Sequence, residues 1–405
     1  MNPWKRYLII YFAVFITGAS LFASYNLIVD PLGRTQWVNK KKFNEVKFYA
    51  TSLIRDFKAN VLYLCDYDHF ILGTSRVESG VNPAWLPEGR GFNGALGGST
   101  SQEVRYVTDY LLEHQKPKTV VWGLDFIQFN DRRPLHPGFE ASFFYPDVAP
   151  WLLFKYALSA DTYEKSQQVL AQNRFQDIKL CNYDGLSQLP ELTVDPQTAF
   201  YVTIKRYVHN EELYNPRFNF GEERLREFEY VVTRLKEEGV DVYLFIPPIH
   251  SAMQESINAV GLESEFVRWR RALVESLGRI NEGVPEDEQV KLWDFTGNNS
   301  INDELIQVDT GRSDNFRDPA HMRLAVGELV MDRVLGRNNL DVPDDFGVAL
   351  TPDNIDAWER DSIAGRDAYR AGSPWMMEQI EEIVTEYNET KGTDSAWDDP
   401  SPGMF

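Results

Sequence analysis

The sequence predicts an α/β protein with a parallel sheet, preceded by a segment that crosses a membrane. Short apolar runs alternate with amphipathic helical patterns between His69 and about Leu335, which is the order of elements in a parallel sheet flanked by helices. An uncharged apolar stretch runs from Tyr7 to about Leu27, and about twenty such residues suffice for a helix to cross a bilayer. The 405 residues are 43% hydrophobic, which is enough for a sizeable core.

Five short runs rich in β-branched or aromatic residues are the strand candidates, as expected for strands that are buried on both faces. They are Phe70 to Leu72, Gly91 to Asn93, Thr119 to Leu124, Val240 to Ile246 and Val290 to Phe295. Amphipathic helices are expected from Thr100 to Gln115, Glu222 to Glu238, Glu263 to Ile280 and Leu324 to Leu335.

The remaining segments divide the chain into parts. Residues 1–30 form the predicted anchor, and residues 31–68 a juxtamembrane segment with a helix from Lys40 to about Lys58. The α/β domain covers residues 69–338, with a large insertion of helices and loops at about 132–221 that we expect to build a substrate cleft or a lid. Residues 339–405 form an acidic extension with helical segments around Trp358 to Arg370 and Trp375 to Asn388.

The N-terminal segment admits two interpretations, a cleaved signal peptide or an uncleaved signal anchor. We favour the anchor, because the apolar core of a signal peptide is usually shorter. Lys5 and Arg6 precede the apolar stretch, so the positive-inside rule places them in the cytoplasm and everything after Asp30 in the periplasm or outside the cell.

The formal charge of −20, from 61 acidic and 41 basic residues, argues against a nucleic-acid partner. The six histidines are scattered and no CxxC or HxxxH pattern occurs, so we expect neither a metal site nor a cofactor. Cys65 and Cys181 are the two cysteines. In an oxidising compartment they form one disulfide, and the alternative is a buried free thiol at Cys65.

A serine and an acid–base pair suggest hydrolase chemistry. Ser75 ends a short apolar run, and Asp318 and His321 lie three residues apart far downstream. A serine hydroxyl becomes a good nucleophile when a histidine accepts its proton, and an acid fixes the tautomer of that histidine. Because catalytic groups collect at the carboxyl ends of parallel strands, we expect Ser75, Asp318 and His321 to meet there as a triad.

These segments resemble the SGNH/GDSL hydrolase superfamily. Gly73-Thr74-Ser75 looks like its first block, Asp318-Pro319-Ala320-His321 fits its last, and Phe92 to Gln102 is similar to its second. The resemblance covers about Phe70 to Leu335 apart from the insertion. It implies an SGNH-like (flavodoxin-like) sheet, with Ser75 as nucleophile and the backbone N–H groups of Ser75 and Gly98 in the oxyanion hole.

The third block departs from the family pattern. The family places Gly-x-Asn-Asp after the third strand, whereas this chain has Asp125 there and Asn130 a few residues later. An aspartate would repel the oxyanion, and the loss of one donor costs roughly a hundred- to a thousandfold in rate. Either a loop brings in Asn130, or the two backbone donors suffice, or catalysis is weak or absent.

Three further residues at strand ends have alternative roles. Arg76 either binds an anionic group of the substrate or pairs with a nearby carboxylate. Asp125 either lines the substrate site or binds the loop that carries Ser75. His250, after the fourth strand, either lines the cleft or acts as an alternative base, in competition with a purely structural role.

The N-terminal anchor leading into Asn26 to Gly33, the GxSR block and the altered third block are similar to a divergent branch of the superfamily. That branch includes membrane-anchored proteins of lipoteichoic acid D-alanylation and relatives of alginate acetylation proteins, which often act beside a membrane-bound O-acyltransferase. The resemblance implies an esterase or O-acyltransferase acting on acyl esters, for example acetyl esters, of a cell-envelope or secreted glycan. The alternative is a non-catalytic binding or scaffold protein in a glycan O-acylation complex.

Overall fold

The computed structural model describes residues 2–49, 53–146, 150–175, 180–187, 194–210, 213–214, 218–306 and 313–390. The chain divides into two compact units. Unit 1 contains residues 1–66 and 137–183, and unit 2 contains residues 67–136 and 184–405. The predicted insertion is therefore shared between the units, and the predicted acidic extension is part of unit 2.

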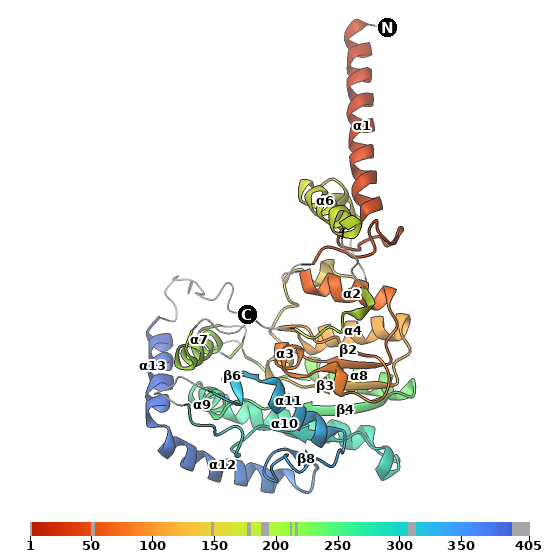
Figure 1. Ribbon diagram of the computed structural model, residues 1–405. Helices are drawn as coiled ribbons and strands as arrows, with labels where there is room; N and C mark the ends of the chain where they lie inside the picture. The colour runs from red at the N-terminus through yellow and green to blue at the C-terminus, as the bar shows by residue number, and fades with distance from the viewer. Residues whose placement is uncertain are drawn as a thin grey trace. The chain divides into compact units, whose positions relative to one another are not determined.

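Unit 2 is built on a six-stranded sheet in the order β2-β1-β3-β4-β5-β8 (Figure 1). The strands are β1 (His69–Leu72), β2 (Gly91–Asn93), β3 (Thr119–Gly123), β4 (Asp241–Ile246), β5 (Leu292–Asp294) and β8 (Val348–Leu350). The first five are parallel, in the 2-1-3-4-5 order of flavodoxin-like sheets, and β8 is antiparallel to β5. The predicted α/β class with a mostly parallel sheet is confirmed, and its five strands lie where the sequence placed them.

Side chains alternate between the two faces of this sheet, and helices cover both faces. On one face Trp122 of β3 contacts Phe228 of α8 (Glu222–Glu237), at a distance of 5.6 Å between ring centroids. On the other face Val121 belongs to a buried apolar cluster that includes Phe200 and Val330. The sheet is thus the centre of a two-sided core, which explains why its strands are apolar throughout.

The helices of unit 2 largely match the sequence patterns. They are α3 (Ser75–Gly80), α4 (Ser101–His114), α7 (Pro196–His209), α8 (Glu222–Glu237), α9 (Ser251–Ala259), α10 (Glu263–Ile280), α11 (Leu324–Val334), α12 (Ile355–Gly372) and α13 (Pro374–Thr390), with short 3-10 turns at Pro83–Trp85, Phe126–Phe129 (η3) and Glu286–Glu288. Thr100 and Glu103 form a capping box that fixes the start of α4.

The C-terminal part of unit 2 completes the α/β domain. Strand β8 adds the sixth strand, and α13 packs against α7 and α9. Lys205 of α7 pairs with Glu386 of α13 at 2.7 Å. Residues 391–405, at the end of the predicted extension, lie outside the described part of the chain.

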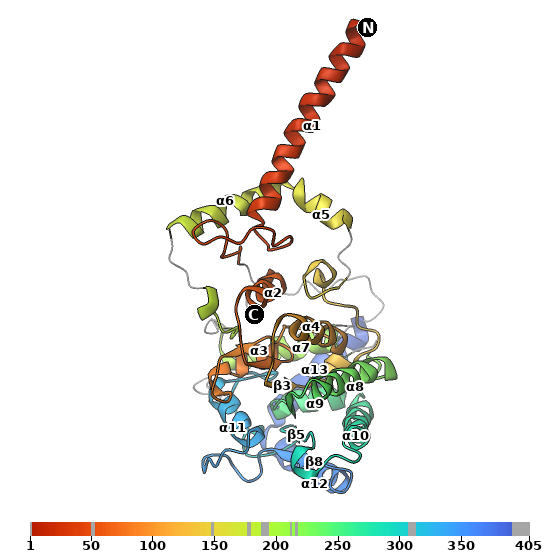
Figure 2. The same cartoon turned by 90° about the vertical axis from the view of Figure 1, so that its right-hand side faces the viewer.

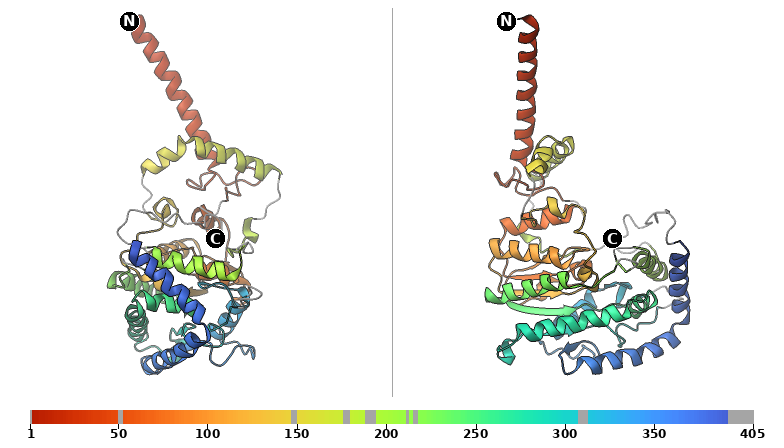
Figure 3. Two further views of the ribbon diagram at one scale, coloured as in Figure 1. Left: turned by 90° about the vertical axis from the view of Figure 1, so that its left-hand side faces the viewer. Right: turned by 180° about the vertical axis from the view of Figure 1, so that it is seen from behind.

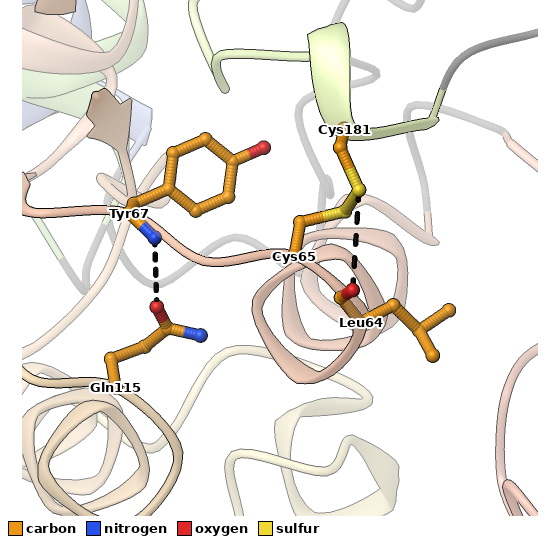
Figure 4. The surroundings of a disulfide bond; sticks show 5 residues. All are labelled: Leu64, Cys65, Tyr67, Gln115 and Cys181. Carbon is orange, nitrogen blue, oxygen red and sulfur yellow. Dashed lines mark hydrogen bonds between the residues drawn. A yellow bond between two sulfur atoms is a disulfide. The ribbon is translucent and has the colours of Figure 1, made fainter. Parts of the chain in front are cut away.

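Unit 1 contains α1 (Pro3–Val29), α2 (Ile54–Leu64), α5 (Pro150–Ala157) and α6 (Ala160–Phe175), with 3-10 turns at Phe139–Ala141 and Leu180–Asn182. Within this unit, α5 and α6 lie across the end of α1 (Figures 2 and 3). Among the described residues α1 is the one helix that is long and apolar enough to cross a membrane, a property that signal sequences share. Cys65 and Cys181 form a disulfide (Figure 4), so the first of the two predicted alternatives holds.

The helix predicted from Lys40 to about Lys58 is wrong in its first half. Described residues up to Tyr49 form turns, and α2 begins at Ile54. Polar side chains bind the backbone in that stretch. The carboxamide of Asn44 donates to the carbonyl oxygens of Ile28 and Val29, at 3.1 and 3.0 Å. Lys42 adopts a positive φ angle of 62°, which a right-handed helix excludes.

Candidate active site

Ser75, His321 and Asp318 form a hydrogen-bonded chain in unit 2. Ser75 is the first residue of α3, directly beyond the carboxyl end of β1. Its Oγ lies 2.9 Å from Nε2 of His321. The other ring nitrogen, Nδ1, lies 2.8 Å from Oδ2 and 2.9 Å from Oδ1 of Asp318. The structure therefore brings together the three residues that the sequence singled out, in the geometry that a serine nucleophile requires.

A tight hairpin presents the acid and the base to the same point. Strands β6 (Phe316–Asp318) and β7 (His321–Met322) are antiparallel, with Asp318 opposite His321. The Asp318 carboxylate also accepts the backbone N–H groups of Ala320 at 2.9 Å and of His321 at 3.2 Å. This turn explains how two residues three positions apart direct their side chains to each other.

The Asp318 carboxyl group is kept ionised. Burial opposes its ionisation, but the facing His321 imidazole and the N–H of Ala320 outweigh burial and lower the pKa of Asp318. Asp318 is 1% and His321 5% exposed, whereas Ser75 is half-buried. Ser75 is thus more exposed than the two residues to which it is linked.

The backbone N–H groups of Ser75 and Gly98 are the two predicted donors to an oxyanion. Within the described residues, neither the N–H of Ser75 nor that of Gly98 has a hydrogen-bond acceptor. The neighbouring N–H of Gly97 donates to Oε2 of Glu78 at 3.1 Å. Gly98 has a φ of +65°, a conformation that favours glycine. These contacts support Gly98 rather than Gly97 as the second donor.

Gly73 allows the chain to pass close to Gly123 of β3, two residues before Ser75. A Cβ at this position would lie 2.9 Å from the carbonyl oxygen of Gly123 and 2.9 Å from Cγ2 of Val77. Its φ is +149°, so a side chain would also strain the backbone. The glycine in the first block is therefore a packing requirement at this site.

Asp125 binds both neighbours of Ser75 in the sequence. Its Oδ2 accepts the hydroxyl of Thr74 at 2.9 Å, and its Oδ1 lies 2.9 Å from Nη1 of Arg76. Of the two alternatives for Asp125, the structure shows the one in which it binds the loop that carries Ser75. Its two oxygens are directed to structural partners rather than to an oxyanion.

Arg76 is 4% exposed. Burial alone would lower its pKa, but the Asp125 carboxylate and the nearby Tyr207 and Tyr214 raise it, so the guanidinium stays charged. Its centre lies 5.9 Å from the ring of Tyr207. This placement agrees with the carboxylate-pairing alternative for Arg76 and leaves little surface for binding an anionic substrate group.

Asn130 is fully buried at the end of η3. Its side-chain oxygen accepts the backbone N–H groups of Arg132 at 3.1 Å and Asn219 at 3.0 Å. Asn130 also forms an isolated β-bridge with Phe220. The carboxamide therefore joins two chain segments in unit 2.

His250 is fully buried and caps α9. Its Nδ1 accepts the N–H of Ala252 at 3.1 Å, and its Nε2 lies 2.7 Å from the carbonyl oxygen of Glu304. Burial lowers the pKa of His250 to about 4, so the ring is neutral at physiological pH. Both ring nitrogens have structural partners, which favours a capping role over substrate contact.

Arg133 is a neighbour of Gly98 that sequence reasoning missed. A Cβ added to Gly98 would lie 3.1 Å from Nη2 of Arg133 and 3.6 Å from Cδ2 of His136. Hydrogen bonds fix the segment, since the carbonyl of Arg133 accepts from Arg224 at 2.8 Å and the N–H of His136 donates to Glu103 at 2.9 Å. Arg133 opens the insertion and belongs to no motif, so its only sequence signal was a basic residue following the third strand.

No group of three or more His, Cys, Asp or Glu side chains able to hold a metal ion occurs among the residues that the structure describes. The chain matches no protein-family model and no curated protein.

Proposed function

We propose that the protein is a membrane-anchored serine esterase or O-acyltransferase of SGNH type, which acts on acyl esters of a cell-envelope or secreted glycan. The hydrogen-bonded chain Ser75–His321–Asp318 carries the proposal. The flavodoxin-like strand order and the position of Ser75 beyond β1 support the SGNH assignment. The glycan and the membrane-bound O-acyltransferase partner rest on the sequence resemblance.

Acylation begins when Nε2 of His321 accepts the Ser75 proton and Oγ attacks the ester carbonyl. The carbonyl oxygen gains negative charge, which the N–H groups of Ser75 and Gly98 stabilise. Asp318 holds the imidazolium that forms. When the tetrahedral intermediate collapses, His321 returns the proton to the departing sugar oxygen, and Ser75 retains the acyl group as an ester.

Deacylation repeats these steps with a new acceptor. His321 removes a proton from the acceptor hydroxyl, whose oxygen attacks the acyl-serine carbonyl, and Ser75 leaves with the proton from His321. Water as the acceptor yields a free acid and makes the protein an esterase. A sugar hydroxyl yields a new ester and makes it a transferase.

The end of α1 supports an uncleaved anchor. Its last turns are part of unit 1, because the Asn26 side chain donates to the carbonyl oxygens of Ala157 at 2.9 Å and Ser159 at 3.2 Å. Phe22 also stacks on Tyr163, with ring centroids 5.4 Å apart. Removing the helix would leave these groups without partners. With Lys5 and Arg6 on the cytoplasmic side, the active site faces the periplasm or the exterior.

The first test is labelling of the detergent-solubilised full chain with a fluorophosphonate, combined with release of acetate from an acetylated glycan. We expect Ser75→Ala to abolish both, whereas Ser264→Ala, which changes an exposed serine of α10, retains both. Unchanged labelling and turnover in Ser75→Ala would exclude Ser75 as the nucleophile. Trapping of an acetyl group on Ser75 by mass spectrometry is the second readout.

The altered third block favours one competing function, a non-catalytic scaffold in an O-acylation complex. Asp125 occupies the third-block position and binds Thr74 and Arg76 instead of supplying a carboxamide donor. A scaffold predicts no labelling and no acetate release with any acetylated glycan, while binding to the glycan or to an acyltransferase persists equally in wild type and Ser75→Ala.

A further inference from the structure

Unit 1 exposes a group of aromatic and basic side chains around the end of α1. On α5, Trp151 is 62% and Phe154 69% exposed. In the turns after α1, Trp37 is 70% exposed, and Lys40, Lys41 and Lys42 are exposed as well. We call Trp37, Lys40 to Lys42, Trp151 and Phe154 the collar.

Both parts of the collar are fixed to the end of α1. The Tyr156 hydroxyl of α5 donates to Oδ1 of Asp30 at 2.9 Å. The same Asp30 carboxylate accepts the backbone N–H groups of Thr35 at 3.0 Å and Gln36 at 2.8 Å, directly before Trp37. The position of the collar along the α1 axis is therefore set by one buried carboxylate.

α5 has two faces of different character. Tyr156 and Ala157 are buried against the end of α1, whereas Trp151 and Phe154 lie exposed on the opposite side of the helix. Lys155 is exposed beside them. A short helix with an exposed aromatic face and a basic flank is typical of segments that lie in a membrane interface.

The length of α1 between Trp4 and the point where α5 binds is close to the thickness of the hydrocarbon core of a bilayer. Asn26, which binds α5, lies 22 residues after Trp4 in one continuous helix, or about 33 Å at a rise of about 1.5 Å per residue. The hydrocarbon core of a bilayer is about 30 Å thick. If Trp4 lies at one interface, the collar lies at the other.

The charges of the collar indicate which lipids it meets. Lys40, Lys41 and Lys42 are exposed, whereas the other two cations of residues 31–49 have acidic partners. Arg34 pairs with Asp56, and the buried Lys47 lies beside Asp30. A run of exposed lysines next to a membrane span is attracted to anionic headgroups. Trp and Tyr side chains favour the same layer.

We propose that the collar lies in the headgroup layer of the leaflet in which α1 ends and binds anionic lipids there, so that α1 and α5 hold unit 1 against the membrane. The proposal rests on α1 being an uncleaved anchor. It does not depend on the chemistry of Ser75.

The experiment uses the full chain reconstituted in phosphatidylcholine–phosphatidylglycerol bilayers. The native cysteines are disulfide-bonded, so Phe154→Cys provides a single free thiol for an NBD label, with Trp37→Cys as an independent second site. We expect both labels to emit at shorter wavelength and to lose fluorescence when lipids carry a nitroxide near the headgroup. A label at Glu286→Cys, in an exposed turn of unit 2, is the water-exposed reference.

The headgroup preference is measured with nitroxides on phosphatidylglycerol or on phosphatidylcholine. We expect stronger quenching by the anionic lipid, and the combined variant Lys40→Gln, Lys41→Gln and Lys42→Gln should remove the difference. If both nitroxide lipids quench the label equally in the protein that retains the three lysines, the proposal that the collar binds anionic lipids is wrong.

Alkaline extraction separates failure of the collar from failure of the anchor. If the protein resists extraction but the labels at Phe154→Cys and Trp37→Cys are not quenched, the proposal for the collar is wrong. The proposal that α1 is an uncleaved anchor is then still supported. Protein that alkali extracts overturns both. Acetate release that depends on Ser75 is unaffected by either result, so the proposed enzymatic function is judged separately.

Discussion

Asp125 is the residue that binds the loop carrying Ser75 on both sides. Its two oxygens bind the residues on either side of Ser75, and both the carboxylate and the Arg76 guanidinium are almost fully buried. A buried charge that loses its partner is strongly destabilising. Asp125 is therefore expected to maintain the loop, which explains why an acid can occupy a position where it would otherwise repel an oxyanion.

We expect Asp125→Asn to lower the free energy of unfolding of unit 2 by about 3 to 5 kcal/mol, because Arg76 is left buried without a counter-ion. Urea denaturation of the solubilised protein measures this change. Adding Arg76→Met should recover part of the loss. The matched control is Asp109→Asn, which removes an exposed pair with Arg105 and should cost below about 1 kcal/mol. Equal losses of stability in Asp125→Asn and Asp109→Asn would contradict the role of Asp125 in holding the Ser75 loop.

Arg133 is the residue that we expect to act beside the oxyanion hole. Its guanidinium lies next to Gly98, so a positive charge is near the site of the developing oxyanion. We expect Arg133→Ala to reduce kcat/KM for acetyl ester cleavage by about tenfold to a hundredfold, somewhat less than the loss of a direct oxyanion donor.

Two variants separate this effect of Arg133 from a general loss of charge. Arg133→Lys should retain more activity than Arg133→Ala, because it keeps the cation. Arg132→Ala removes the exposed neighbouring arginine and should leave the rate unchanged. A wild-type rate in Arg133→Ala, with folding intact, would exclude this role.

At the scale of elements, the sequence was informative where side chains repeat with a regular period. The helix from Glu263 to Ile280 and the strand from Gly91 to Asn93 lie where their patterns placed them. Strand β8 was missed, because its three residues carry no alternation and follow an acidic, turn-rich stretch. Its strand character comes from pairing with β5, a contact that no local pattern records.

In the candidate site, too, some residues were predictable from local sequence and others were not. Short motifs predicted Ser75, Asp318 and His321, because their roles depend on residue type and spacing. The pairing of Asp125 with the Ser75 loop was predicted only as one of two alternatives. Arg133 was not predicted, since its position depends on contacts across the fold. Arg224, which helps to hold the Arg133 segment, is 91 residues away from Arg133 in sequence.

The start of α9 provides a test of pH dependence. His250 caps this helix only when its Nδ1 is unprotonated, and its pKa is lowered from 6.5 to about 4. Between these values the unfolded chain binds the additional proton, so stability decreases as the pH falls. The expected loss from pH 6.5 to 4 is about 3 kcal/mol, because the ring is fully buried.

We expect His250→Asn to remove this component, since asparagine also caps helices but does not titrate. Urea denaturation at several pH values compares the variant with wild type. Ser264→Ala, which changes an exposed non-titrating residue of α10, should keep the wild-type dependence. If the free energy of unfolding of His250→Asn falls with pH as steeply as that of wild type down to pH 4, protonation of His250 is not the cause of the loss.

At the scale of the whole molecule, the chain passes through unit 1 twice. Unit 1 consists of residues 1–66 and residues 137–183, and the first three strands of unit 2 lie between these two segments in the sequence. The Cys65–Cys181 disulfide joins these two passages across a sequence separation of 116 residues (Figure 4). Ser75, Asp318 and His321 all belong to unit 2, whereas both cysteines belong to unit 1.

We therefore expect the double variant Cys65→Ser and Cys181→Ser to destabilise unit 1 by about 4 to 5 kcal/mol, the loop-entropy value for a closed loop of this length. Limited proteolysis followed by mass spectrometry should show faster cleavage within residues 137–183, while fragments of unit 2 remain protected. Acetate release should persist, because the Ser75–His321–Asp318 contacts lie wholly in unit 2. The exposed double variant Ser264→Ala and Glu286→Ala controls for substitution alone. Loss of activity in step with cleavage of unit 1 would instead mean that the two units depend on each other for catalysis.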